Sequence, residues 1–110
     1  MATPDDFLRI EMRVGTVLEA EPFPEARKPS IKLRIDFGAE LGVKRSSAQL
    51  TRHYEPGQLV GRQVVAAVNL GERRIAGFPS EVLVLGAVPA EGDVVLLALE
   101  RPVPNGTRIA

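Results

Sequence analysis

The side chains best suited to bind a ligand gather in one loop of this 110-residue chain. The segment 69–81 reads NLGERRIAGFPSE and contains two adjacent arginines, Arg73 and Arg74, and an aromatic residue, Phe78, between glycine and proline. Arginine binds phosphate through paired hydrogen bonds, and an aromatic ring offers a flat apolar surface. The loop therefore carries the strongest indication of a binding function.

Positive charge is concentrated in the middle of the sequence. Lys and Arg balance Asp and Glu at 14 each, but residues 26–75 hold ten basic against four acidic side chains, whereas residues 1–25 hold two basic against six acidic ones. The central excess can form a basic face for an anionic partner, or it can be spread over solvated strand faces without a ligand. The candidate phosphate-binding residues are Arg27, Lys28, Lys32, Arg34, Lys44, Arg45, Arg73 and Arg74.

Residues that would support catalysis are scarce. His53 is the one histidine and cysteine is absent, so the usual zinc ligand sets cannot be assembled. Ser46 and Ser47 lack a nucleophile-elbow motif and an identifiable base partner. The glycines match neither dinucleotide nor P-loop spacing. We therefore predict no enzymatic activity, no metal site and no cofactor.

The composition, 45% hydrophobic and 25% charged, is typical of a single globular domain over residues 1–110. No apolar run approaches the ~20 residues that a membrane span requires. The acidic N-terminal residues are unlike a signal peptide, and cysteine is absent. These features predict a cytoplasmic protein with no membrane insertion.

Strands must position the binding residues. Apolar and polar residues alternate over 31–37 and over 8–18, and Gly15 within the second segment predicts a bent strand. Segments 64–68 and 82–85 are apolar throughout, which predicts strands that are buried on both faces. One face would lie on the core, and a helix or another subunit would cover the other. With the apolar run 94–99 they favour a dimer.

The remaining segments give shorter signals. Residues 43–51 read as a strand with a small, polar centre, Ser46 to Gln49, so another group is expected to approach its backbone closely. Thr3-Pro4-Asp5-Asp6 is typical of a helix start, and residues 54–61 predict one helical turn. Several strands with little helix predict an antiparallel barrel or sandwich, and the bent first strand favours a small barrel.

Several motifs resemble the tRNA-binding oligonucleotide-binding fold (OB-fold) domain. They are Asn69-Leu70, Arg73-Arg74-Ile75, Gly77 and Ser80-Glu81, and also Arg13-Val14-Gly15, residues 33–38, Ser47 with Leu50, and residues 59–65. Within that superfamily, residues 26–33, 44–51, 80–86 and 103–106 are similar to the export-related chaperones of the CsaA family. The likeness covers nearly the whole chain.

The resemblance implies an all-β, five-stranded Greek-key OB-fold barrel with short helical turns and N- and C-terminal extensions. It further implies a cytoplasmic homodimer that binds unfolded or presecretory polypeptides and cooperates with a SecA-type export motor. The chain departs from the tRNA binders where these typically have Lys-Pro-Arg-Lys, since it has Gly71-Glu72-Arg73-Arg74. The usual Ser-x-Gly-Met is replaced by Ser80-Glu81-Val82-Leu83. Both changes weaken the case for tRNA.

Two binding functions and one alternative without a ligand remain open. A chaperone would hold an extended peptide in a groove with apolar pockets and short polar contacts, for which we predict the residues Phe23, Ser47, Gln49, Tyr54, Asn69, Phe78, Ser80 and Glu81. A structure-specific tRNA-binding protein would use the eight basic residues above to hold phosphates. It would recognise shape rather than stacked bases, because aromatic residues make up 5% of the chain and tryptophan is absent. The alternative is a dimeric scaffold whose basic face has no ligand.

Overall fold

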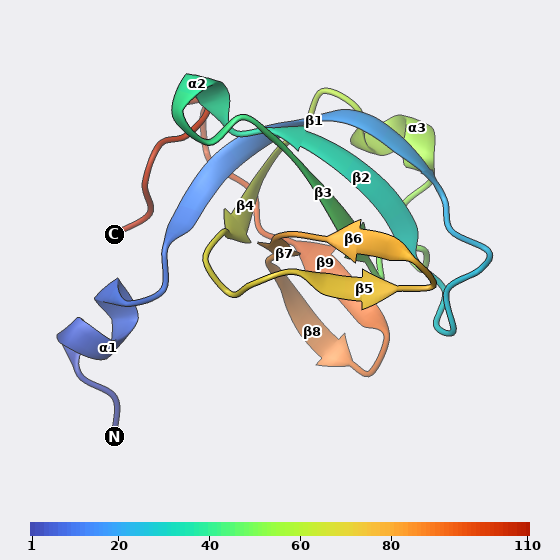
Figure 1. Cartoon of the computed structure of the whole chain (residues 1–110), viewed down its shortest axis with the longest axis horizontal. Helices are drawn as coiled ribbons and strands as arrows, with labels where there is room; N and C mark the ends of the chain where they lie inside the picture. The colour runs from blue at the N-terminus through green and yellow to red at the C-terminus, as the bar shows by residue number, and fades with distance from the viewer.

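A five-stranded antiparallel barrel forms the centre of the computed structural model, which describes residues 1–110 (Figure 1). The strand order is β3-β2-β1-β4-β7, and β3 lies beside β7 to bring the barrel close to full closure. The strands are β1 (Met12–Pro22), β2 (Ile31–Asp36), β3 (Val43–Ala48), β4 (Gln63–Ala67) and β7 (Leu83–Val84). The OB-fold expectation is confirmed.

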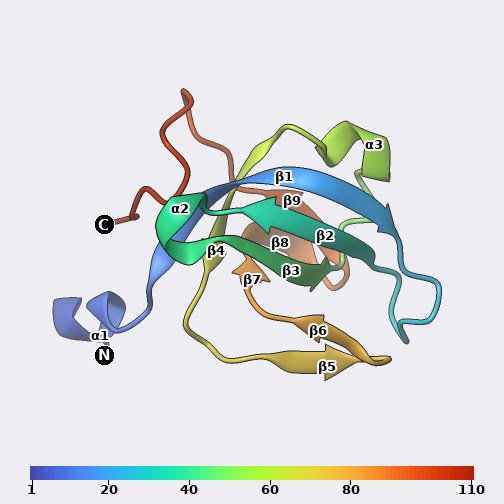
Figure 2. The same ribbon diagram turned by 45° about the horizontal axis from the view of Figure 1, so that its top comes forward.

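Two hairpins and three short helices complete the chain. The hairpins are β5 (Arg73–Ile75) with β6 (Phe78–Ser80) and β8 (Gly86–Ala90) with β9 (Asp93–Leu96). The helices are α1 (Pro4–Leu8), α2 (Gly38–Leu41) and α3 (Pro56–Leu59). Figures 1 and 2 show the β5–β6 hairpin on the side of the barrel where β3 lies, with α3 at another corner.

The barrel core follows the alternation read from the sequence. Ile31, Leu33 and Ile35 of β2 and the following Phe37 are almost fully buried, while the residues between them face outward. Each buried aliphatic or aromatic side chain stabilises the fold by about 1.5–3 kcal/mol relative to an exposed one. The outward residues of β2 are therefore free to form the binding surface.

Gly15 is required by packing rather than by a bulge. A Cβ at this position would lie 2.6 Å from Cγ2 of Ile35 and 2.8 Å from the ring of Phe37. The irregularity in the β1–β2 register comes later, between Val17 and Glu19. Strand β1 is bent, as expected (Figure 1), but its register shift lies after Gly15 rather than at it.

Both faces of β4 are buried, as the continuous apolar run predicts: Val64 and Ala66 face the core, and Val65 and Ala67 face outward. The expected cover was a helix or another subunit. At the Gln63 end, the cover is instead the C-terminal arm of the same chain. The outward Gln63 side chain exchanges hydrogen bonds with Val103, 2.7 and 3.1 Å, and also donates to Asn105 Oδ1 at 3.1 Å.

The small, polar centre of β3 is also explained by the chain itself. Residues 80–82, which lead into β7, approach it closely: the hydroxyl of buried Ser46 donates to the carbonyl oxygen of Val82 at 2.9 Å. Ser47 N–H donates to Ser80 Oγ at 3.0 Å, and Glu81 N–H donates to the carbonyl oxygen of Arg45 at 2.8 Å. Strand β3 is therefore used for barrel closure, and it ends at Ala48 rather than at the expected residue 51.

The helix predicted from Thr3-Pro4-Asp5-Asp6 is present as α1. Thr3 caps α1 by accepting from Asp6 N–H, and the Asp6 carboxylate accepts from Thr3 N–H at 2.9 Å. The strand expected over 8–18 begins only at Met12, because residues 4–8 are helical. Helix α1 stands away from the barrel and buries none of its residues (Figure 1).

Two apolar runs form less strand than expected. The run 82–85 forms a two-residue strand, and of the run 94–99 only the part up to Leu96 is in β9. The expected turn at 54–61 is confirmed as α3, whose Leu59 is fully buried. No helix combines the length and the apolar character that crossing a bilayer would require.

Candidate ligand-binding groove

A groove of about 430 Å³ crosses the outer face of β1, β2 and β3. Its apolar lining comes from Leu18, Ala20, Leu33, Val60 and Phe78, and its charged lining from Glu19, Glu21, Lys32, Arg34 and Arg45. The charged residues stand on the strands at alternate positions, as the period of two dictates. The groove therefore combines three apolar side chains that reach the surface, Leu18, Val60 and Phe78, with charges that are paired across the strands.

An aromatic pair stands at one side of this groove. Phe78 of β6 meets Phe23, which follows β1, with ring centroids 5.5 Å apart and planes at 68°. The ammonium group of Lys32 lies over both rings, 4.7 Å from the Phe23 centroid and 5.1 Å from that of Phe78. Phe23 is buried while Phe78 is half-buried, so Phe78 is the ring that remains available to a ligand.

The turn of the β5–β6 hairpin holds Phe78 in place. Ala76 and Gly77 both have positive φ, 47° and 81°, which is the requirement of a two-residue turn that follows the twist of a hairpin. Arg74 Nη1 donates to the carbonyl oxygen of Gly77 at 3.1 Å. The sequence segment 69–81, expected to be a loop, thus contains an ordered hairpin.

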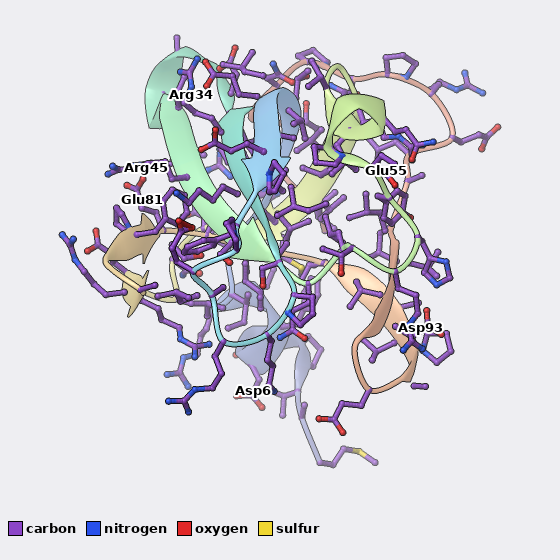
Figure 3. All side chains as sticks on the ribbon, turned by 90° about the vertical axis from the view of Figure 1, so that its right-hand side faces the viewer. Asp6, Arg34, Arg45, Glu55, Glu81 and Asp93 are labelled. Atoms are coloured by element: carbon purple, nitrogen blue, oxygen red, sulfur yellow. The ribbon has the colours of Figure 1, made fainter.

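Opposite charges face one another across the strands. Arg34 lies 2.7 Å from Glu19 and Lys32 lies 4.0 Å from Glu21, because these residues are direct partners in the β1–β2 register. The hydrogen bond from Arg34 lowers the pKa of the Glu19 carboxyl group below its ordinary value and raises that of Arg34. Figure 3 shows Arg34, Arg45 and Glu81 together on one flank of the molecule, far from Asp93.

Glu81 and Arg45 form a third ion pair, at 3.1 Å, which also fixes the backbone. The same carboxylate oxygen accepts from the guanidinium Nε and from Arg45 N–H at 3.0 Å. Partial burial raises the pKa of the Glu81 carboxyl group, but the hydrogen bonds from Arg45 lower it more, so the net direction is downward. Glu81 therefore remains ionised at neutral pH.

Five of the eight residues predicted to bind peptide lie together where β3, β6 and the end of β1 meet: Phe23, Ser47, Phe78, Ser80 and Glu81. Gln49 is exposed just after β3. Most of the five are already occupied by contacts within the chain, and Phe78 is the one that lines the groove. The predicted cluster is brought together, but largely as the support of the groove.

Tyr54 and Asn69 lie elsewhere. The Tyr54 hydroxyl accepts from Leu96 N–H at 3.0 Å and its ring lies under the guanidinium of Arg62, so it holds β9 against the barrel. Asn69 accepts from Glu11 N–H and donates to the carbonyl oxygen of Arg9, both at 2.8 Å, and so ties α1 to the end of β4. Neither residue is part of the groove lining.

The eight predicted phosphate-binding residues do not form one free basic face. Lys32, Arg34 and Arg45 line the groove but are paired with acids, and Arg74 is paired with Glu72 at 3.4 Å. Lys44 lies opposite Ile35 and so on the side of β3 that faces the barrel interior. Arg27, Lys28 and Arg73 are exposed and make no ion pair.

Groove residues that the sequence did not single out are Leu18, Glu19, Ala20, Glu21, Leu33 and Val60. Glu19 and Glu21 alternate with Leu18 and Ala20 at the end of β1, a pattern that would have marked a half-buried strand face. His53 contacts the Asp93 carboxylate outside the groove, and no group of three or more His, Asp or Glu side chains stands close enough to hold a metal ion.

A family model described as "Putative tRNA binding domain" matches residues 12–108. The crystal structure of the chaperone CsaA of Bacillus anthracis is 58% identical, with a TM-score of 0.95 over 100% of this chain and 99% of that one. The CsaA chaperone of Picrophilus torridus is 44% identical, with a TM-score of 0.91 over the whole of both chains.

A second group of relatives is much longer. The methionine–tRNA ligase of Porphyromonas gingivalis is 38% identical over 105 residues, which are 96% of this chain and 15% of the ligase. The chain spans about the same small share, 15–16%, of the other ligases it matches. These comparisons relate this barrel to one part of each ligase.

Proposed function

The chain belongs to the tRNA-binding domain family and, within it, groups with the CsaA chaperones, and on this premise we propose that it is a non-enzymatic chaperone that binds unfolded polypeptides. The observation that carries the proposal is the groove over β1–β3, which combines an apolar lining with charges that are already paired. An unfolded polypeptide segment offers apolar side chains of many kinds. Such a groove therefore suits a polypeptide better than the phosphate backbone of an RNA.

The groove explains how binding can be broad. Phe78 presents a half-buried ring and Leu18 and Val60 present exposed aliphatic side chains, so apolar side chains of different shapes find contact. Lys32 beside Phe78 is paired with Glu21 at 4.0 Å, too far for a hydrogen bond, so its ammonium can still donate to a backbone carbonyl of the ligand. These contacts do not require the ligand to have one particular amino-acid sequence.

We further propose that the protein forms a homodimer and acts in the cytoplasm, before its ligands are exported. Apolar side chains on α1 and the β8–β9 region remain exposed, namely Phe7, Leu8, Ile10, Val88, Val95 and Leu97. A second copy of the chain would cover such residues and place two grooves in one particle, which increases avidity for a long ligand. The unfolded ligands would be presecretory polypeptides, and a SecA-type motor would receive them.

Binding and assembly are tested separately. A fluorescent, permanently unfolded polypeptide should bind the protein, with anisotropy rising to saturation and little dependence on salt. Total tRNA should displace it only at low salt. Light scattering at micromolar concentration should give twice the 11.9 kDa mass of one chain. Absence of polypeptide binding at any salt concentration would end the chaperone proposal, and an 11.9 kDa particle would end the dimer.

Structure-specific tRNA binding is a second candidate, favoured by the family and by three of the predicted phosphate-binding residues, which are exposed and unpaired. Arg27 and Lys28 lie between β1 and β2, and Arg73 begins β5. Exposed, unpaired cations release counterions when they bind phosphate, which gives a steep dependence of affinity on salt. Tight tRNA binding at physiological salt, with no polypeptide binding, would select this candidate.

A further inference from the structure

Three acidic residues form ion pairs with the basic residues of the groove. Glu19 pairs with Arg34, Glu21 with Lys32, and Glu81 with Arg45. The first two pairs are set by the register of β1 on β2, and the third by the seam at which residues 80–82 meet β3. Three basic side chains and three acidic ones thus meet on a face that the basic residues alone would make positive.

Two of the carboxylates stand at hydrogen-bonding distance from their cations. Glu19 Oε1 lies 2.7 Å from Arg34 Nη2, and Glu81 Oε1 lies 3.1 Å from Arg45 Nε. These are the positions in which a phosphate oxygen would accept from the same donors. A polyanion would have to displace the carboxylates and then lie beside them, so that repulsion offsets the attraction.

Strand stability alone does not account for the arrangement. Glu19 and Arg34 are largely exposed, and exposed ion pairs of this kind contribute little to folding. Their effect on the field in front of the groove is larger, because each carboxylate cancels a cation where the ligand would approach.

We propose that Glu19, Glu21 and Glu81 are specificity-determining residues that hold the groove electrically neutral, so that it rejects polyanions such as tRNA and accepts apolar polypeptide segments. The proposal rests on the polypeptide-binding function above and names its discriminating element. It also explains how a barrel of this family can keep basic residues on β2 and β3 without a net basic face.

The test uses the double variant Glu19→Gln/Glu21→Gln, which frees Lys32 and Arg34 and leaves the seam at Glu81 intact. The matched control is Asp5→Asn/Glu91→Gln, which removes two negative charges that are exposed, make no ion pair and do not line the groove. Fluorescence anisotropy measures tRNA affinity from 50 to 300 mM salt, roughly the range over which counterion release is visible. Thermal melting checks that both variants are folded.

Freeing two cations should steepen the slope of log affinity against log salt by about 1.4–1.8 and raise tRNA affinity about tenfold or more at the lowest salt. The control should show neither change. Adding Lys32→Met and Arg34→Met to the double variant should restore the original slope. Equal gains in the double variant and its control, or no gain in either, would overturn the proposal.

Polypeptide binding is measured on the unaltered protein in the same series. Failure of the chaperone function would appear there as the absence of any polypeptide complex. Failure of the carboxylate proposal would appear only in the comparison of the two double variants. The two results are therefore independent.

Discussion

Phe78→Ala tests whether the groove is the polypeptide site. Phe78 lies in the lining, packs edge-to-face with Phe23 and has the ammonium of Lys32 5.1 Å from its ring centroid. An aromatic side chain that anchors a ligand typically contributes about 2 kcal/mol or more to binding. The variant should therefore bind an unfolded polypeptide about 30-fold more weakly, as measured by fluorescence anisotropy.

The same change has a calculable effect on stability. It removes an edge-to-face aromatic contact, about 0.5–1.5 kcal/mol, and one cation–ring contact, about 0.5–1 kcal/mol. For a domain of this size each kcal/mol lowers the melting temperature by about 4 °C. A decrease of about 4–10 °C follows, which leaves a folded protein for the binding assay if the parent melts in the usual range.

Tyr54→Phe is the matched control, because the sequence pattern also assigned Tyr54 to peptide binding. The structure places its hydroxyl on Leu96 N–H at 3.0 Å, outside the groove. Loss of this hydrogen bond should destabilise the fold by about 1 kcal/mol and leave polypeptide affinity unchanged. The reasoning is refuted if Phe78→Ala binds as well as the parent, or if the two variants lose affinity equally.

Three further changes test the framework around the groove. Gly15→Ala should destabilise the protein by about 1–3 kcal/mol in urea unfolding, since its Cβ would lie 2.8 Å from the Phe37 ring; an unchanged midpoint would contradict the packing argument. Asn69→Ala should increase proteolysis before residue 11, because it removes both side-chain hydrogen bonds that tie the segment after α1 to the end of β4, and parental protection would exclude this role. Folding lowers the pKa of Glu81, so the contribution of this carboxylate to stability is present above its pKa in the unfolded chain and is lost as pH falls. Glu81→Gln should therefore flatten the decline in melting temperature between about pH 5 and 3. An unaltered decline would count against the pairing of Glu81 with Arg45.

The sequence predicted the strands best where one face is buried and the other wet. Over 31–37 the alternation gives both the strand and the faces, and the burial of Ile35 and Phe37 confirms it. The runs 82–85 and 94–99 have no alternation, so nothing in them marked where pairing stops. Barrel closure and the β8–β9 hairpin limit them to short strands.

The candidate site was predicted only in part, because residue type does not reveal which groups are already satisfied. Ser47, Ser80 and Asn69 are polar residues near strand ends, which suits ligand binding and backbone capping equally. Only long-range contacts, such as Ser47 with Ser80 across the seam, distinguish the two. Phe78, which the sequence places in a loop between Gly77 and Pro79, does line the groove, and its contact with a peptide stays a prediction.

The distribution of charge shows most clearly why a count along the chain differs from the surface that the chain forms. Along the sequence, residues 1–25 have an acidic excess and residues 26–75 a basic one. The β1–β2 register places Glu19 opposite Arg34 and Glu21 opposite Lys32, so part of each excess cancels across neighbouring strands. The exposed cations of residues 26–75 that make no ion pair are Arg27, Lys28, Arg52, Arg62 and Arg73, and none of them lines the groove. Residual affinity for tRNA should therefore be carried by these cations, whereas polypeptide binding should depend on the neutral strand face of the groove.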